Sequence, residues 1–430
     1  MNIRVLAVMA FVILLTGCGD LLGPDKEGWK SSQKSDFIDI LKTDKYMSIC
    51  NQKAMSDRVI SSKNSKLMTK MLVVYAYNLA NSCIDMNEFN ASQSAKRAKG
   101  IETYYATYQE EVKASSIKMK LRAGQTIEQI LKPYVPESPQ FKALSDKYRV
   151  LKSSESKISQ KKLRLIRINI ERTKLMKQEL GSHYALINVP EFKVRIIEEG
   201  NTTLDFPVIV GKANMQTPIF SEKLKYVEIN SQWNVPDSIM RKSYIPKIKR
   251  NPGWVKAKGY ELHKSYDLRS PKVNPASVNW SKYPKDGKGD IPYKLIQVPS
   301  RSNGLGRVKF IFPNRHAVYM HDTQSKSLFK KKRRAFSHGC IRLGKPKALL
   351  NHITANYSAK TLPTVNSWYE SVKTKHLILN KDLQVHTAYY TAYVNETGAL
   401  KLFPDVYGFD KSQKLNFKVT FEPIRLKNES

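Results

Sequence analysis

One short run of residues places a potential nucleophile beside a potential base. The run Ser337-His338-Gly339-Cys340-Ile341-Arg342 contains one of only four cysteines among 430 residues, and a second histidine, His321, lies nineteen positions before that cysteine. A thiol reacts as its thiolate, and a neighbouring imidazole can take the proton and remain as a stabilising cation. The pattern therefore predicts a cysteine nucleophile, Cys340, with a histidine base. The competing interpretation is a buried structural cysteine with two surface histidines nearby.

The residues around the thiol can be given separate roles. His321 can reach the sulfur from a neighbouring strand, so we predict that it is the base and that His338 lines the cleft. Gly339 lets the backbone approach a carbonyl, and the backbone N–H groups of Gly339 and Cys340 are the predicted oxyanion donors. The group that orients His321 is left open between a backbone carbonyl and Asp322, which should face away from it on a strand. The spacing of the two histidines and the cysteine does not fit a zinc site, so no metal or cofactor is predicted.

The same run resembles the S/T-H-G-C signature of the L,D-transpeptidase (YkuD-type) catalytic domain, which also has a histidine just under twenty residues before its cysteine. The likeness extends over roughly 163–408 and is similar to the large-scaffold murein branch of the family. A small peptidoglycan-binding module that relatives often insert before the catalytic domain has no counterpart here. The further matching segments are Val210-Gly211-Lys212, Gln216-Thr217-Pro218, Trp233-Asn234-Val235-Pro236, Gly304-Leu305-Gly306-Arg307, His321-Asp322-Thr323, Leu328-Phe329 and Arg334-Ala335.

This resemblance implies an enzyme that forms 3→3 cross-links in peptidoglycan. Cys340 would attack a tetrapeptide stem, release D-Ala and transfer the acyl group to a second stem. Arg342, Tyr319 and Ser337 would bind substrate, although Arg342 could instead form a structural salt bridge and Tyr319 could pack in the core. The acceptor stays open: water would make the same site an L,D-carboxypeptidase, an endopeptidase or a hydrolase of lipoprotein–peptidoglycan links. A wall-binding protein without activity is a second alternative, which acylation of Cys340 by a carbapenem would exclude.

The N-terminus predicts export and lipidation. An apolar stretch from Val5 to Leu15 is too short to span a bilayer and is typical of a secretion signal. Leu15-Thr16-Gly17-Cys18 resembles a bacterial lipobox, so residues 1–18 are predicted to be a lipoprotein signal peptide with Cys18 as the lipidation site; an ordinary signal peptide is the alternative. The predicted location is the periplasm, anchored to a membrane. By family resemblance, Gly19 favours the outer membrane.

The two remaining cysteines, Cys50 and Cys83, are disulfide candidates because the periplasm is oxidising. The alternative is a pair of buried thiols.

The formal net charge of +36 predicts a polyanionic partner. Because the chain is predicted to be exported, we expect peptidoglycan carboxylates and anionic lipids as partners, and no nucleic acid. The run Lys330-Lys331-Lys332-Arg333-Arg334 lies directly before the signature, where it would either steer substrate or form a solvated surface.

Periodicity divides the chain into a helical part and a strand-rich part. Apolar residues recur at three- and four-residue spacing from 31 to 118 and again from 157 to 180, whereas alternation from His183 onward predicts strands. We therefore expect an α+β protein: a helical scaffold followed by an antiparallel β-rich catalytic sandwich with a long lid-like insertion. The scaffold would brace the catalytic domain or bind a cell-wall synthase. The predicted parts are a tether at 19–30, the scaffold at 31–162, the catalytic domain at 163–408 with lid or insert segments at 265–303 and 324–334, and a C-terminal tail at 409–430.

Overall fold

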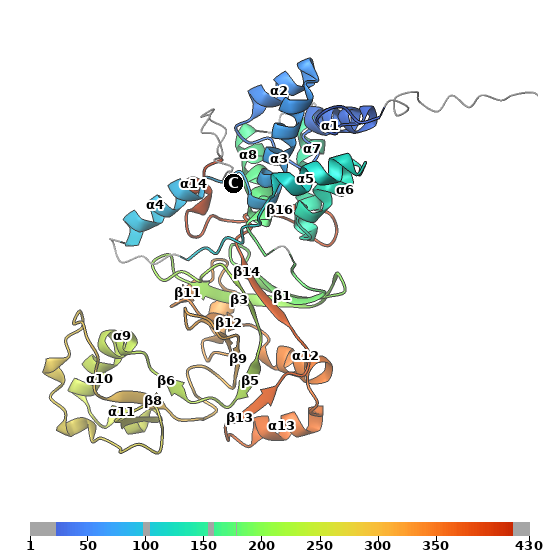
Figure 1. Cartoon of the computed structure of the whole chain (residues 1–430). Coiled ribbons are helices and arrows are strands. Elements are labelled where there is room, and N and C mark those ends of the chain that lie inside the picture. The colour runs from blue at the N-terminus through green and yellow to red at the C-terminus, as the bar shows by residue number, and fades with distance from the viewer. Residues whose placement is uncertain (1–22, 98–103, 154–158, 178, 416–430) are drawn as a thin grey trace, which may run out of the picture. The chain divides into compact units, whose positions relative to one another are not determined.

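The computed structural model describes residues 23–97, 104–153, 159–177 and 179–415. These residues fold into two compact units (Figure 1). Among the described residues, the first unit comprises 23–85, 108–137 and 415, and the second comprises 86–97, 104–107, 138–153, 159–177 and 179–414.

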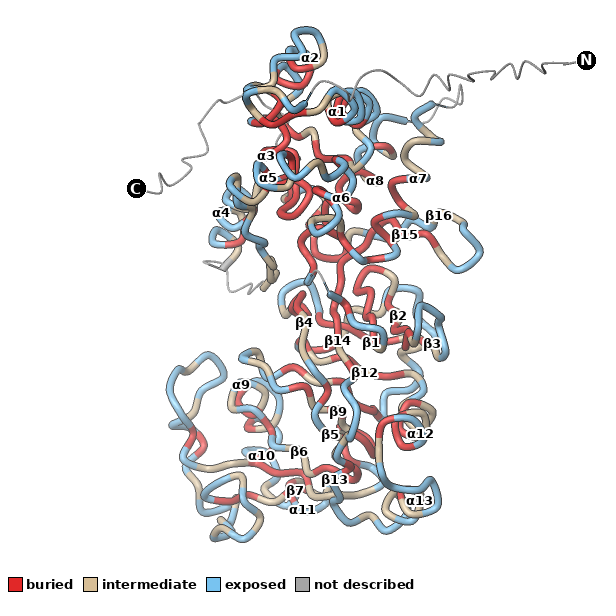
Figure 2. The backbone as a smooth tube through the Cα atoms, turned by 45° about the vertical axis from the view of Figure 1, so that its right-hand side comes forward, coloured by how far each residue is buried: buried red, intermediate tan, exposed pale blue. Residues whose placement is uncertain are grey.

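The first unit is helical, as predicted, and packs around its longest helix. Most of α3 from Met68 onward is buried, including Met71, Leu72, Tyr75 and Leu79, and its tube is largely in the buried colour in Figure 2. A helix that is buried on nearly all sides lies inside the core. The helices are α1 (Ser31–Thr43), α2 (Lys53–Ser62), α3 (Ser65–Asn81), α5 (Ala114–Arg122) and α6 (Ile127–Leu131).

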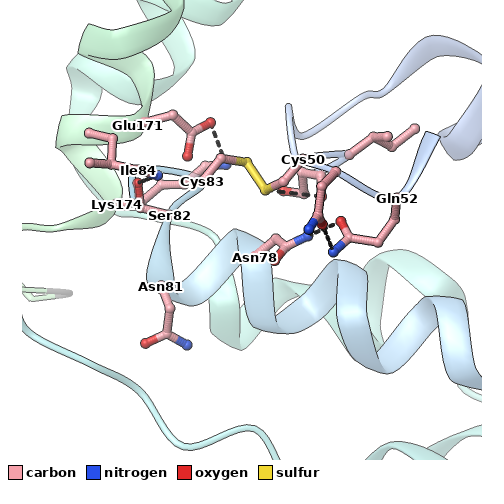
Figure 3. The surroundings of a disulfide bond; sticks show 12 residues. Cys50, Gln52, Asn78, Asn81, Ser82, Cys83, Ile84, Glu171 and Lys174 are labelled. Carbon is pink, nitrogen blue, oxygen red and sulfur yellow. Dashed lines mark hydrogen bonds and ion pairs between the residues drawn. A yellow bond between two sulfur atoms is a disulfide. The ribbon is translucent and has the colours of Figure 1, made fainter. Parts of the chain in front are cut away.

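The predicted disulfide is confirmed. Cys50 and Cys83 are bonded, with their Cα atoms 5.4 Å apart (Figure 3). The Asn78 amide lies beside the bridge and donates at 2.9 Å to the Ser48 carbonyl and at 2.9 Å to the Gln52 side chain. The disulfide therefore ties the segment before α2 to the end of α3.

The second unit contains every described strand and nine further helices. Its helices are α4 (Met86–Arg97), α7 (Pro139–Ser153), α8 (Gln160–Lys174), α9 (Asp237–Ile239), α10 (Ile245–Arg250), α11 (Trp254–Ala257), α12 (Pro346–Tyr357), α13 (Leu362–Glu370) and α14 (Phe409–Ser412). Its strands are β1 (His183–Asn188), β2 (Lys193–Glu198), β3 (Asn201–Gly211), β4 (Ser221–Lys223), β5 (Tyr226–Ile229), β6 (Trp233–Asn234), β7 (Tyr260–His263), β8 (Lys294–Gln297), β9 (Val308–Ile311), β10 (Met320–His321), β11 (Ala335–Ser337), β12 (Ile341–Leu343), β13 (Lys375–Ile378), β14 (Gln384–Ala388), β15 (Ala392–Val394) and β16 (Leu400–Leu402).

Most of these strands form one mixed sheet, so the predicted α+β class is confirmed. Eleven strands join in the order β13-β5-β9-β10-β12-β3-β2-β1-β14-β4, with β11 on β3. The pairing departs from the purely antiparallel arrangement that we expected, because β1 with β14, β10 with β12 and β11 with β3 are parallel. Buried side chains of β1, β2, β3, β5, β9 and β14 form the main core together with α12.

Residues 233–297 form a small subdomain with a core of its own, which we call the insertion subdomain. It contains a three-stranded sheet in the order β6-β8-β7, and α9, α10 and α11 lie with it (Figure 1). Its core includes Val235, Ile248, Leu262, Trp280 and Leu295. The predicted irregular lid at 265–303 is therefore largely part of a folded subdomain that begins earlier in the chain.

The signal peptide, Cys18 and part of the tether lie outside the described residues. The predicted tail begins inside folded structure, since Phe409 is buried and its ring centroid lies 4.4 Å from that of Tyr389. The predicted boundary after residue 162 lies within α8 and stays a prediction. Among the described residues, none of the helices has both the length and the apolar character needed to cross a bilayer.

Replacing both disulfide cysteines (Cys50→Ala/Cys83→Ala) should lower the free energy of unfolding of the first unit by about 3 to 4 kcal/mol. The bridge closes a loop with a sequence separation of 33, and a cross-link of that length restricts the unfolded chain by about this amount. Denaturant unfolding followed by far-UV circular dichroism measures the change. The Cys340→Ala variant is the control and should keep wild-type stability; equal stability of all three proteins would contradict the prediction.

Candidate active site

The relative position of the predicted residues follows from two very short strands. β10 runs parallel to β12, with Met320 opposite Ile341 and His321 opposite Arg342. The Ile341 N–H donates to the Tyr319 carbonyl at 3.0 Å. Side chains alternate between the faces of a strand, and directly paired residues share a face. His321 and Arg342 therefore lie on one face, and the same alternation brings Tyr319 and Cys340, two residues earlier in each segment, to that face.

Cys340 is half-buried and directly precedes β12. Its sulfur lies 3.9 Å from the Ala317 carbonyl oxygen. Burial raises the pKa of this thiol, and the Tyr319 backbone N–H, the Lys309 ammonium, the Tyr319 hydroxyl and Arg342 act against that increase. The thiol is therefore neutral at rest and needs a base, while its surroundings favour the thiolate once it forms.

His321 has the properties of that base. Its side chain is 4% exposed, and its Nδ1 atom is buried with no hydrogen-bond partner among the described residues. Burial, and then the positive charge of Arg342, lower the pKa of this imidazole to about 4, against hydrogen bonds to the backbone of Leu305 and Asp322. The imidazole is therefore neutral at ordinary pH, with a ring nitrogen available to accept a proton.

The backbone of Leu305 and Asp322 forms hydrogen bonds with the His321 imidazole. The Asp322 carboxylate bonds to other groups. It accepts the Arg307 N–H at 2.9 Å and the Thr323 N–H at 2.7 Å, and it forms an ion pair with Lys326. Gly306, at a φ of 70°, packs against it so closely that any side chain at 306 would overlap the carboxylate. Asp322 thus shapes the segment 304–307, whose Leu305 backbone contacts the imidazole.

The turn that presents Cys340 is closed by Ser337. The Ser337 hydroxyl donates to the Cys340 carbonyl at 2.6 Å and accepts the Gly339 N–H at 3.1 Å. Gly339 has a φ of 114°, a conformation that L side chains rarely adopt. The Gly339 N–H is thus engaged within the turn, which corrects its predicted role as an oxyanion donor and leaves the Cys340 N–H for that role. Ser337 is buried, so the structure favours a positioning role over the predicted contact with substrate.

A second segment, which the analysis of single residues did not identify, supports the same turn. The Thr217 hydroxyl donates to the Gly339 carbonyl at 2.7 Å and accepts the Gly211 N–H at 2.9 Å. The Tyr407 hydroxyl accepts the Thr217 N–H at 3.0 Å and donates to the Gly211 carbonyl at 2.9 Å. Gly211 and Thr217 belong to segments that carry the sequence resemblance, but Tyr407 gave no signal because it lies nearly seventy residues after the signature.

His338 lies at the exposed side of the turn. Partial burial, followed by the positive charges of Lys212, Arg342 and Lys242, lowers the pKa of its imidazole. Lys242 belongs to the insertion subdomain, which therefore approaches the catalytic turn. The role of His338 in lining the cleft stays a prediction.

A row of charged and polar side chains crosses the sheet at the level of His321. The register pairs Arg342 with His321, His321 with Lys309, Lys309 with Glu228, and Glu228 with His376. The Lys309 ammonium lies 3.9 Å from the Glu228 carboxylate and 4.5 Å from the centre of the Tyr319 ring. Lys309 is a site residue that the sequence did not reveal, because only the strand pairing brings it beside Tyr319 and Cys340.

Arg342 lies close to the thiol without a carboxylate partner. Its Nε atom is buried and has no hydrogen-bond partner in the described part of the chain, and no described ion pair involves its guanidinium. Burial lowers the pKa of Arg342, and Cys340 acts in the opposite direction. A cation left in this state is suited to an incoming anion, so the structure gives no support to the alternative of a structural salt bridge.

The sequence left Tyr319 either as a core residue or as a residue that contacts substrate. In the structure it is half-buried and interacts with Cys340, so both interpretations hold in part. Burial raises the pKa of its hydroxyl, and the interaction with Cys340, which includes a hydrogen bond, raises it further. The phenol therefore stays protonated and can donate toward the sulfur.

Within the described residues, no group of three or more His, Cys, Asp or Glu side chains is arranged to hold a metal ion.

Comparison with known proteins agrees with this geometry. Residues 182–378 match the YkuD family, described as the L,D-transpeptidase catalytic domain. A Haemophilus influenzae protein named "Putative L,D-transpeptidase" is 32% identical over 263 residues, which cover 61% of this chain and 50% of that protein. The present chain thus matches half the length of that relative.

Two solved structures are also similar. An L,D-transpeptidase from Mycobacterium smegmatis is 12% identical, over 48% of this chain and 58% of that one, with a TM-score of 0.21. The catalytic domain of an E. faecium L,D-transpeptidase is 12% identical, over 49% and 99% of the two chains, with a TM-score of 0.20. Because these TM-scores are low, no feature of those two sites is assigned to this chain.

Acylation of Cys340 by the carbapenem imipenem should persist in mild acid. The base is active only when neutral, so a pKa of about 4 for His321 places half-maximal acylation near pH 4. In Arg342→Gln the loss of a neighbouring cation should raise the His321 pKa and move this acid limb to higher pH. Mass spectrometry of the adduct at each pH measures the rate, with Arg333→Gln, an exposed cation, as the control. An acid limb near pH 6.5 in the wild type would contradict the prediction.

Replacing Lys309 should make the thiol harder to ionise. Its ammonium lowers the Cys340 pKa, so Lys309→Met should move the pH profile for alkylation of Cys340 by iodoacetamide to higher pH. Peptide mass spectrometry quantifies the modified Cys340. Lys375→Met, at an exposed position of the same sheet, is the matched control and should leave the profile unchanged. Identical profiles for the two variants would show that Lys309 does not tune the thiol.

Proposed function

Because residues 182–378 belong to the L,D-transpeptidase catalytic-domain family, we propose that the protein forms 3→3 cross-links in peptidoglycan through an acyl-enzyme on Cys340. The observation that carries this proposal is the buried, unpartnered imidazole nitrogen of His321 on the sheet face that Cys340 adjoins. A neutral base with an unpartnered ring nitrogen, on the sheet face that a neutral thiol adjoins, supports activation of that thiol as a nucleophile.

In the first step, the Cys340 sulfur attacks the carbonyl of the L-centre of diaminopimelate in a tetrapeptide stem. His321 takes the thiol proton as the C–S bond forms, and the carbonyl oxygen becomes an oxyanion. The Cys340 N–H and the Tyr319 hydroxyl are the candidate donors to this oxygen, since the Gly339 N–H is already engaged. The protonated His321 then gives its proton to the amine of D-Ala, which leaves as the peptide bond breaks.

In the second step, the side-chain amine of a second stem attacks the thioester. His321 accepts a proton from that amine as the new amide bond forms, the C–S bond breaks, and the protonated imidazole returns the proton to the Cys340 sulfur, which regenerates the thiol. Arg342 supports binding of a stem carboxylate because its guanidinium has no ion pair in the described structure and lies near Cys340. The positive charges of Lys309, Lys212 and Lys242 around the turn favour the same anionic substrate.

The proposal is tested by incubating the full-length protein with disaccharide-tetrapeptide and analysing the products. The wild type should yield a cross-linked dimer and free D-Ala, and it should carry a transient acyl adduct on Cys340. Cys340→Ala should form neither product nor adduct, while its circular dichroism spectrum stays that of the wild type. An adduct on the alanine variant would refute the assignment of the nucleophile.

The same experiment separates transfer from hydrolysis. If water is the acceptor, the wild type yields disaccharide-tripeptide and D-Ala without dimer, and the protein is an L,D-carboxypeptidase. We favour an amine acceptor because Lys242 of the insertion subdomain lies close enough to the turn to act on His338, which places part of that subdomain where it can help to exclude water.

We further propose that the protein acts in the periplasm, held to the outer membrane by a lipid on Cys18. This proposal rests on the lipobox-like sequence and on the disulfide between Cys50 and Cys83, since disulfides persist in oxidising compartments.

A further inference from the structure

The insertion subdomain contains a cavity that the proposed reaction does not use. It has a volume of about 520 Å³ and lies between α10 and the segment 280–285. Its lining is four cations, two aromatic rings and four other residues: Arg241, Lys249, Arg250, Lys285, Trp280, Tyr283, Ile245, Pro246, Ser281 and Pro284. Pockets of a few hundred Å³ hold small ligands rather than single ions.

All the charged side chains that line this cavity are positive. No acidic side chain lines it, and no ion pair within the described residues involves any of its four cations. The end of α10 favours Lys249 and Arg250 through the helix dipole, but this does not explain Arg241 or Lys285, which come from other segments. Lys249, Arg250 and Lys285 are exposed and Arg241 is buried, so the cavity presents one buried and three solvent-facing positive charges with no acidic side chain between them, which suits an anion.

Arg241 is the fixed member of the set. Its side chain is 6% exposed, its guanidinium donates to the Gly289 carbonyl at 2.8 Å, and it lies 5.8 Å from the centre of the Tyr283 ring. A side chain at Gly287 would approach the Arg241 guanidinium to 3.1 Å. A buried cation with only a neutral partner is costly unless a ligand neutralises it.

The aromatic walls are also held in place. Trp280 is buried, and its indole N–H donates to the Pro275 carbonyl at 2.8 Å. Its ring centroid lies 6.2 Å from that of Tyr283. The cavity thus joins rigid apolar surface to positive charge, which fits a ligand that has carboxylates on a bulky body.

One short π-helical segment connects the cavity to the catalytic turn. In Met240–Tyr244, Arg241 lines the cavity, while the adjacent Lys242 lies close enough to His338 to lower its pKa. π-Helical turns are rare and frequently occur at functional sites. A polymer bound at the turn of Cys340 would therefore lie near the segment Met240–Tyr244, whose Arg241 lines the cavity.

We propose that this cavity binds a carboxylate-bearing disaccharide-peptide unit of the cell-wall polymer, outside the reacting stem. The proposal rests on the proposed function, because it assigns the cavity to the same polymer. The two arginines would bind carboxylates in bidentate fashion, and the Trp280 and Tyr283 walls would pack against the body of the ligand.

The test compares two paired-charge variants of the full-length protein. Lys249→Gln/Arg250→Gln removes two cavity cations, and Lys256→Gln/Lys258→Gln removes two exposed cations of the same subdomain outside the cavity. Cross-linking of disaccharide-tetrapeptide is measured with each, together with acylation by imipenem, which reports on Cys340. We expect the KM of the cavity variant to rise at least tenfold, with kcat within twofold of wild type and with unchanged acylation by imipenem.

The outcomes separate this inference from the proposed function. If the wild type is acylated by imipenem and cross-links its substrate, but the KM values of the two variants are equal, the cavity does not bind the polymer. Binding is also measured by calorimetry on Cys340→Ala, and a sugar phosphate that binds as tightly as disaccharide-tetrapeptide would overturn the assignment. Lys285→Gln, at an exposed position on the opposite wall, should also raise KM and gives a second measurement if the double variant unfolds.

Discussion

The parallel pairing of β10 with β12 is the constraint on which the site depends. β10 consists of two residues, Met320 and His321, yet its register against β12 places the imidazole on the face that Cys340 adjoins. A slip of one residue would turn His321 to the opposite face of the sheet. The hydroxyls of Ser337 and Thr217 hold the adjoining turn, because each bridges two backbone groups around Gly339. The nucleophile is thus positioned by strand register and by hydroxyl groups that do not take part in the reaction.

Burial and charge act in opposite directions on the reacting groups. Burial raises the pKa of Cys340 and lowers that of His321, so both groups are neutral at rest and no ion pair has to be maintained in the empty cleft. The surrounding cations, Lys309 and Arg342, favour the thiolate and the anionic substrate, and Arg342 also opposes protonation of the imidazole. In the proposed reaction, the proton moves from Cys340 to His321 when substrate is present, and the cations that favour the thiolate also suit an anionic substrate.

Much of the fold was predictable because it rests on local periodicity. The three- and four-residue spacing in α3 and the alternation in β1 and β2 were sufficient to identify these elements. The predicted export and the count of cysteines made Cys50 and Cys83 disulfide candidates, and the structure decided in favour of the bond. The insertion subdomain was missed because its strands have two to four residues and its core is assembled from distant turns. The predicted tail was wrong at its start, since Phe409 packs on Tyr389 across a separation that no local pattern reports.

The sequence by itself determined the chemistry that the site can perform. A thiol, an imidazole nineteen positions upstream and a glycine beside the thiol predict a cysteine nucleophile, and the segments around them resemble the L,D-transpeptidase catalytic domain, which residues 182–378 match. Only the tertiary structure decided how these groups act. It showed that the Gly339 N–H is engaged by Ser337, that Asp322 faces the 304–307 segment instead of the imidazole, and that Lys309 lies beside the thiol. The physical reason is that burial, hydrogen-bond partners and charge neighbours depend on strand pairings between segments far apart in the chain, which the order of residues does not fix locally.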